Sequence, residues 1–372
     1  MPVVSDYFKE SPFRVYAGKL SFETGTEDFV PLKMHDDLRR ATENSILSKS
    51  VAIRLVVSGP GGGKTWTLSW LARYFSNFKD TWAIAVPRLE LRGRPERGLV
   101  EAIFLGLKSQ IKELRVKISS SIEAKNLLPR DLLQTPTEYV WWALMDPDAY
   151  AVLCGSGGAM PVINGMKGPQ LTKTEGTLQL LTGLFRVLYF LGYVRVIVLI
   201  DEVESLFVAY GRRDLFIFED YIRNIIDEFQ SDQGRFLPRV AMVLAGTEYV
   251  LRQISPALVG KQTDRSDIAQ SLIRRLESPF ALQAPDRLDA LRIANHRIGA
   301  HRMKALSAPY IPFDEDAILY IWDNTLGIIG DFCQKLQETY ELALEQKAQK
   351  ITLDHAKQVL PQPIELTNPT GN

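Results

Sequence analysis

A glycine-rich loop, VVSGPGGGKTWTL at residues 56–68, constrains this chain more than any other stretch. Four glycines lie between Gly59 and Gly63, and a lysine and a threonine follow them directly. Glycine costs about 0.5–1 kcal/mol relative to alanine in ordered structure, so this position must need bare backbone. An apolar, β-branched run at 51–57 precedes the loop, and an amphipathic pattern over 64–78 follows it. The sequence therefore predicts a strand, a glycine loop and a helix in succession.

Such a loop can hold phosphate groups, because its backbone N–H groups and the positive end of the helix point at the ligand. Lys64 would reach the β- and γ-phosphates of ATP, and Thr65 would place its hydroxyl on Mg²⁺. The usual pattern has a glycine six positions before the lysine, where this chain has Ser58. The alternative is a glycine-rich turn that binds nothing. The other candidate nucleotide-binding residues are Ser58, Gly59, Gly61, Gly62, Gly63 and Trp66.

A second motif, VRVIVLIDEVESLF, runs from apolar residues straight into two acids. A carboxylate at the end of a buried strand would lie beside the glycine loop in a parallel sheet, so Asp201 is the candidate to hold Mg²⁺. Glu202 is placed to polarise the attacking water as a general base. Glu204 is expected to hydrogen-bond only locally. The alternative for all of them is a strand that ends in solvated acids.

The order of elements predicts an α/β fold of the P-loop NTPase type, a parallel sheet with helices on both faces. Strands are expected at 51–57, 81–89, 194–200, 239–246 and 280–285, and one helix is expected over 98–114. Three regions follow from this pattern. Residues 1–50 are expected to form an N-terminal extension with a helix. Residues 51–285 are expected to form the ATPase core, with an insertion near 125–175 that is part helix around 137–145 and part loop. Residues 286–372 are expected to form a helical lid domain.

Composition narrows the class of protein. Lys and Arg number 44 and so do Asp and Glu, so any attraction to nucleic acid must come from a local patch. The only cysteines, Cys154 and Cys333, lie far apart, which argues against a disulfide framework and a cysteine-based zinc site. The N-terminus shows no secretory signal pattern, and no apolar run is long enough to span a bilayer. A cytoplasmic location is the expectation.

On the motifs SGPGGGKT, VIVLIDEVESL, VAMVLAGTEY, SLIRRLESPFALQAP and the segment 325–360, the chain resembles the AAA+ ATPases. It is most similar to the branch that contains origin-recognition proteins, STAND ATPases and transposition regulators of the TniB and TnsC kind. The first two motifs are specific for a P-loop ATPase, and the others are looser. The segment GIIGDFCQKL departs from many members, because it carries no arginine where their lid helix has one.

The resemblance implies two further catalytic residues. Thr247, at the end of the fourth strand, would contact the γ-phosphate or the attacking water. Arg275, or its neighbour Arg274, would act on the ATP of the adjacent subunit and stabilise charge in the transition state. The alternative for Thr247 is an N-cap of the following helix, and the alternative for the arginines is a surface salt bridge.

Basic residues cluster in 87–118, which holds eight Lys or Arg against four Glu. In DNA-handling relatives this region faces the bore of a ring or filament, so Arg92, Arg94, Arg97 and Lys112 are candidates to bind phosphates of double-stranded DNA. The alternative is a solvated helix face.

Three functions remain on the sequence alone. The first is an ATPase that self-associates with ATP and acts on DNA with other proteins of a transposition, mobile-element or defence system. The second is a STAND-like signalling switch that acts on a protein partner. The third, a structural protein with a degenerate loop, is disfavoured by the intact Lys64, Thr65, Asp201 and Glu202.

Overall fold

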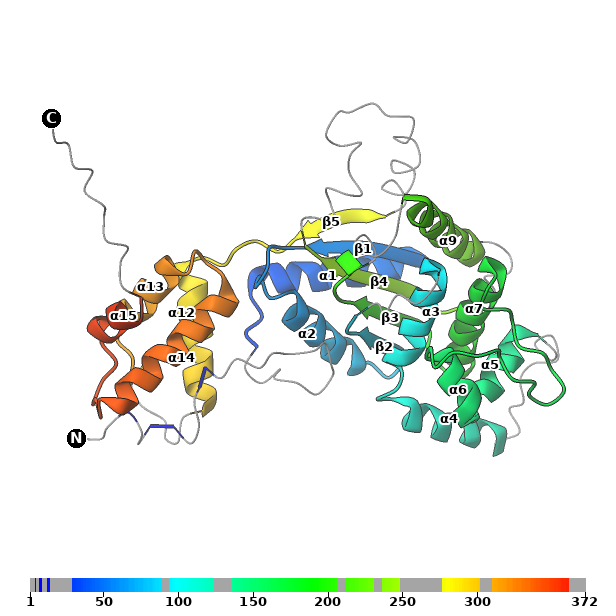
Figure 1. Cartoon of the computed structure of the whole chain (residues 1–372), viewed down its shortest axis with the longest axis horizontal. Helices are drawn as coiled ribbons and strands as arrows, with labels where there is room; N and C mark the ends of the chain where they lie inside the picture. The colour runs from blue at the N-terminus through cyan, green and yellow to red at the C-terminus, as the bar shows by residue number, and fades with distance from the viewer. Residues whose placement is uncertain are drawn as a thin grey trace, which may run out of the picture.

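The structure is a computed structural model. It describes residues 4, 7–8, 12–13, 29–88, 94–123, 135–205, 212–230 (backbone only for 212–219), 236–247, 276–301 and 310–360. The part described forms a core domain around one sheet and a smaller helical group at the other end of the molecule (Figure 1).

The core domain is built on a five-stranded sheet in which every described pairing is parallel. The strands are β1 (Val51–Val57), β2 (Thr81–Val86), β3 (Arg195–Ile200), β4 (Arg239–Gly246) and β5 (Glu277–Ala281). Their order across the sheet is β2-β3-β4-β1-β5. The first four strands carry long runs of buried apolar residues, as strands covered on both faces should. The predicted parallel α/β sheet is therefore confirmed.

Helices cover the two faces of this sheet differently (Figure 1). One face packs on α1 (Lys33–Ser48) and α2 (Lys64–Ser76), and half of the buried strand residues there are alanines, namely Ala83, Ala85, Ala241 and Ala245. Small residues let α2 lie close to the sheet, which brings the glycine loop at its N-terminus to the sheet edge. The other face carries larger residues and is covered by α3 (Pro95–Gly106), α7 (Thr174–Phe190) and α9 (Arg212–Gln230).

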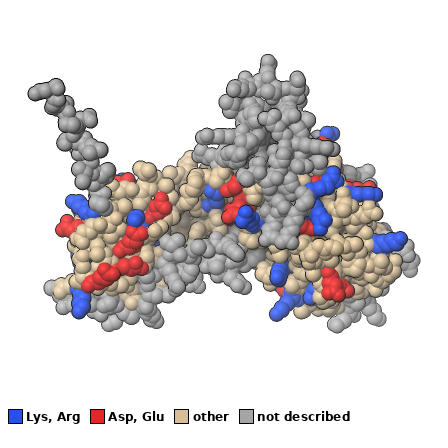
Figure 2. Space-filling model, viewed as in Figure 1, with Lys and Arg blue, Asp and Glu red and all other residues tan. Residues whose placement is uncertain are grey.

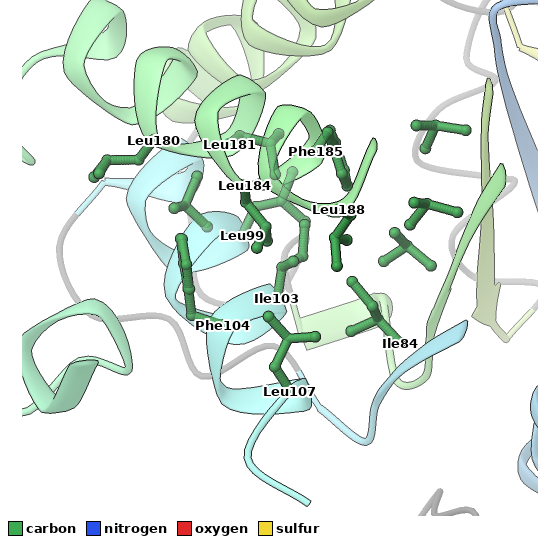
Figure 3. Close-up of a cluster of buried hydrophobic side chains, with 14 of the residues drawn as sticks. Ile84, Leu99, Ile103, Phe104, Leu107, Leu180, Leu181, Leu184, Phe185 and Leu188 are labelled. Atoms are coloured by element: carbon green, nitrogen blue, oxygen red, sulfur yellow. The ribbon is translucent and has the colours of Figure 1, made fainter. Parts of the chain in front are cut away.

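The larger apolar cluster lies on this second face (Figure 3). Side chains of α3, such as Leu99 and Ile103, meet Leu184 and Leu188 of α7 above Ile84 of β2, and all of them are buried. The cluster continues into α4 (Ile111–Glu123), α5 (Pro136–Met145) and α6 (Pro147–Leu153). The aromatic stretch of residues 139–144 belongs to this core.

Two expected elements differ from those observed. The helix expected over 98–114 is two helices, α3 and α4, separated by a hydrogen-bonded turn at 107–110. A Cβ at Gly106 would lie 2.8 Å from the carbonyl oxygen of Ala85, so this glycine lets the end of α3 touch the sheet where the chain turns. The fifth strand covers 277–281 rather than 280–285. It is a short edge strand with a bulge and exposed side chains, so its apolar pattern is weak.

The helical group, called the lid below, consists of α12 (Arg287–His301), α13 (Glu315–Asn324), α14 (Ile329–Glu345) and α15 (Leu353–Val359). Its apolar cluster is separate from the two clusters of the core domain. Val4, Phe8 and Phe13 of the N-terminal region are buried in this cluster, and the N–H of Val4 donates to the carbonyl oxygen of Ala348. These three residues, which precede α1 in the sequence, therefore belong to the lid.

Candidate nucleotide site

Four strand ends meet at the carboxyl edge of the sheet, and backbone hydrogen bonds tie them together. The N–H of Ser58, after β1, donates to the carbonyl oxygen of Gly246 at the end of β4 over 3.4 Å. The N–H of Asp201, after β3, donates to Val86 of β2, and that of Val203 donates to Ala245 of β4. The glycine loop, the acidic pair and the end of β4 therefore share one edge.

The glycine loop has the bare backbone that a phosphate cradle needs. Gly61 and Gly63 adopt left-handed φ values of +69° and +80°, which side chains rarely tolerate. At Gly62 a Cβ would lie 2.4 Å from Ser58 Oγ. Gly63 is also the N-cap of α2, so the helix N-terminus opens directly onto the loop. These features fit an anionic ligand of the phosphate class.

Lys64 lies at the start of α2 with its amine folded back over the loop. Lys64 Nζ donates to the carbonyl oxygens of Ser58 at 3.1 Å and Gly59 at 3.0 Å. Burial lowers the pKa of the Lys64 amine, and the negative charges of Glu204 and Asp201 counteract that shift. Glu204 Oε2 is buried without a hydrogen-bond partner. Glu204 therefore lies near enough to Lys64 for its charge to act on the amine.

Thr65 and Asp201 meet directly, although 136 positions separate them in the sequence. Thr65 Oγ1 donates to Asp201 Oδ2 over 2.5 Å, and the N–H of Glu202 donates to Asp201 Oδ1 over 2.9 Å. Asp201 is only 3% exposed, and burial raises the pKa of its carboxyl, while these hydrogen bonds act in the opposite direction. A hydroxyl and a carboxylate are oxygen ligands that suit Mg²⁺ bound together with a nucleotide. No cluster of three or more His, Cys, Asp and Glu ligands occurs in the described ranges.

Glu202 follows Asp201 but turns away from the buried edge. Its backbone adopts a φ of +51°, in the left-handed region that is strained for a residue with a side chain. Its side chain is about half exposed and forms an ion pair with Arg88, with 3.4 Å between Arg88 Nε and Glu202 Oε2. Arg88 lies two residues beyond β2. The carboxylate is therefore free to reach water once it leaves Arg88.

The remaining candidates of the sequence divide by location. Thr247 directly follows β4 and is half-buried, which places its backbone next to that of Ser58. Arg274 and Arg275 lie outside the described residues, and so does Arg92.

The DNA-binding candidates that the structure describes do not form one free basic surface. Arg97 Nε contacts Glu101 Oε1 at 2.6 Å, and Arg94 is bonded to Glu96 and to the carbonyl oxygen of Thr172. Lys112 on α4 is exposed. The net charge of 87–118 already includes these glutamates, but Arg94 and Arg97 are engaged in ion pairs within the segment.

A cavity lies between the core domain and the lid, directly beside the glycine loop. Four segments line it: Phe29–His35, the loop and first turn of α2 from Gly61 to Trp66, Ile293 and Arg297 of α12, and the start of α14 with Ile329, Gly330 and Cys333. The N–H of Gly330 donates to the carbonyl oxygen of Gly61 over 3.4 Å, so the lid touches the loop. Apolar residues dominate this lining, which suits a base and ribose next to a phosphate cradle.

Comparison with models of known protein families gives no match, and a search of curated proteins gives none. Among solved structures, the chain is similar to the Aeropyrum pernix ORC2 protein in its ADPNP–ADP complexes. The TM-score is 0.55 at 12% identity, over 95% of this chain and 71% of that one. The ADP form of the same protein gives a TM-score of 0.51 at 12% identity, over 91% and 70% of the two chains. The likeness supports the predicted α/β fold of the P-loop type, with its parallel five-stranded sheet. At this identity the likeness concerns the fold alone.

Within this fold, the structure adds residues that the sequence analysis did not single out. His35 and Arg297 line the cavity, and Arg88 contacts Glu202. Arg297 lies among the buried residues of α12, and no sequence motif marks it. The pairing of Arg88 with Glu202 depends on strand order, which motif spacing does not give. No helix in the described part of the chain is both long and apolar enough to cross a membrane.

Proposed function

We propose that the protein binds ATP with Mg²⁺ and hydrolyses it. The observation that carries the proposal is the meeting of Lys64, Thr65 and Asp201 at one sheet edge beneath a loop of bare backbone. The triphosphate would lie along the glycine loop and the N-terminus of α2, with Lys64 on the β- and γ-phosphates. Thr65 and Asp201 would hold Mg²⁺, which when bound neutralises charge on the phosphates. The adenine base of the nucleotide would occupy the cavity under the lid.

In this proposal Glu202 polarises the attacking water, and Thr247 contacts the water or the γ-phosphate. The ion pair with Arg88 is exposed, so breaking it to free Glu202 costs little, roughly 0–1 kcal/mol. Arg275, or Arg274 beside it, would be supplied by a neighbouring subunit. The measurement is ATP binding by calorimetry together with steady-state phosphate release. Lys64→Ala should abolish binding, and undiminished affinity in that variant would refute the site.

We further propose that ATP drives self-association into a ring or filament that binds double-stranded DNA, as part of a transposition, mobile-element or defence system. The specific system rests on the sequence resemblance to TniB- and TnsC-like regulators. Figure 2 shows acidic side chains in a stripe on the lid over α14, where Asp331, Glu341 and Glu345 are exposed. That stripe would repel phosphates, so DNA would approach the core domain, on which the exposed Lys112 is the described candidate. Arg92 stays a candidate from the sequence alone.

A salt series of filter binding with plain duplex DNA tests this second part. Binding should require ATP, ignore sequence and weaken steeply between about 50 and 200 mM salt, because each neutralised phosphate releases counterions. Lys112→Ala should lower DNA affinity and leave ATP affinity unchanged. Lys79→Ala is the matched control, since Lys79 is an exposed lysine of the core domain outside 87–118. Equal losses in the two variants would contradict this assignment.

The second candidate, a nucleotide-controlled switch that acts on a protein partner, is favoured by the direct contact between the lid and the glycine loop. Gly330 meets Gly61 at the loop itself, so a bound phosphate chain and the position of the lid would be coupled. A chain that binds ATP yet stays monomeric and ignores duplex DNA at low salt would select this function over the first.

A further inference from the structure

Arg297 is a buried cation to which no described residue gives a partner of opposite charge. Only 7% of the residue is exposed, and neither Nε nor Nη1 has a hydrogen-bond partner. Its recorded contact is with an aromatic ring: the guanidinium carbon lies 6.0 Å from the centroid of Trp66. A cation–π contact contributes about 0.5–2 kcal/mol, whereas an uncompensated buried charge costs several kcal/mol. The fold therefore maintains an arginine that folding alone does not explain.

The surroundings of Arg297 indicate what would compensate it. It lines the cavity beside the glycine loop, and it lies one helical turn from Ile293 on the same face of α12. The cavity lining contains two cations, Lys64 and Arg297, and no acidic residue. The third titratable nitrogen group, His35, is neutral at pH 7, because burial lowers its pKa to about 4. A cavity with this lining and the positive end of α2 favours an anion.

Successive side chains in the first turn of α2 would face different parts of a bound nucleotide. Lys64 turns back toward Ser58 and Gly59, and Thr65 turns toward Asp201, where the metal and the outer phosphates are expected. Trp66 comes next, and the guanidinium of Arg297 from the lid lies over its ring. Arg297 therefore approaches the nucleotide from the side away from Asp201, where the phosphate nearest the ribose would lie.

We propose that Arg297 binds the phosphate nearest the ribose and so ties α12 to bound ATP and ADP alike. The inference rests on the proposed nucleotide site and adds a residue from a lid helix that the sequence motifs do not mark. Since that phosphate is present in both nucleotides, Arg297 reports occupancy of the site rather than the presence of the γ-phosphate.

The test compares Arg297→Met with Arg292→Met by calorimetry against ATP, ADP and adenosine. Arg292 is the matched control, because it lies on the same helix with its side chain 68% exposed and paired to Asp289. A charged hydrogen bond predicts that Arg297→Met weakens ATP and ADP by a similar factor, about 10- to 100-fold, and leaves adenosine unchanged. Arg292→Met should change none of the three.

Thermal unfolding without nucleotide provides an independent readout. Methionine keeps apolar contact with Trp66 and removes the uncompensated charge, so the midpoint for Arg297→Met should be equal to or above that of the wild type. A lower midpoint would mean that Arg297 serves packing, and would overturn the proposal.

Other results would also overturn it: a loss confined to ATP, an equal loss for adenosine, or no loss. Wild-type protein that binds neither nucleotide would instead remove the proposed function itself. Wild-type binding that Arg297→Met leaves intact would remove this inference alone.

Discussion

The buried imidazole of His35 should make the stability of this protein fall in mild acid. Its Nδ1 accepts a hydrogen bond from the N–H of Leu32 over 2.8 Å, so the neutral ring carries its proton on Nε2, which is buried without a partner. Burial lowers the pKa of His35 from 6.5 to about 4. Protonation would bring a charge into this interior and remove the lone pair that accepts from Leu32.

The direction of this pH dependence follows from the number of protons that the folded and unfolded chains bind. Between pH 6.5 and 4 the unfolded chain holds a proton on His35 that the folded chain lacks, so the stabilisation is complete above pH 6.5 and is lost as the pH falls toward 4. The whole shift corresponds to about 3 kcal/mol, of which about 2 kcal/mol would be lost between pH 7.5 and pH 5.

Urea unfolding of the wild type and of His35→Asn at both pH values isolates this contribution. Asparagine keeps an acceptor for Leu32 but does not titrate, so the variant should lose about 2 kcal/mol less than the wild type over this interval. NMR of the four histidines gives a direct check on the pKa. A His35 resonance that titrates near 6.5, or a difference between wild type and variant that does not depend on pH, would refute the reasoning.

Three further predictions concern the nucleotide site. Gly62→Ala should weaken ATP binding by about 5- to 100-fold in calorimetry, because the added Cβ would collide with the Ser58 side chain. Adding Ser58→Gly to this variant should restore most of the affinity. A double variant that binds ATP as weakly as Gly62→Ala would contradict this prediction. Arg88→Ala should raise the rate of phosphate release by at most about fivefold, since it frees Glu202 from an exposed ion pair. Arg287→Ala is the control, because it breaks the exposed pair with Asp323 and should leave the rate unchanged. A tenfold lower rate in Arg88→Ala would instead give Arg88 a direct role in hydrolysis. Glu202→Gly should slow ATP hydrolysis by about 10²–10⁴-fold, because it removes the proposed general base. The same variant should raise the free energy of unfolding by up to about 1 kcal/mol, because glycine adopts the left-handed backbone without strain. A lower free energy of unfolding in urea would show that this backbone is not strained.

Much of the fold could be predicted because its signals are local. The apolar run 51–57 and the run ending at Gly246 match β1 and β4 within a residue, since a strand buried on both faces needs continuous apolar side chains. The break between α3 and α4 was missed, because it depends on the approach of Gly106 to a strand that lies 20 residues earlier. The edge strand β5 was misplaced by three residues, since exposed side chains carry little pattern.

The candidate site shows the same division. Lys64 and Asp201 stand out because each ends or begins an element in a recognisable motif, and the structure places them at one sheet edge. The charge of Glu204 beside Lys64 and the burial of Arg297 could not be predicted. Both follow from how the strand ends and the lid are arranged in space, and a single sequence contains no record of that arrangement.

Two crossings between the lid and the core domain can be traced through the described residues, and they limit how the lid can move. Phe13 is buried in the lid cluster and Leu38 in the core domain, and the chain returns to the lid between β5 and α12. A body held by one flexible connection can turn about any axis. Two connections at separate points leave mainly rotation about the line that joins them. The lid would then open and close over the glycine loop by one rotation. The same rotation would admit nucleotide and pass any signal to a neighbouring molecule.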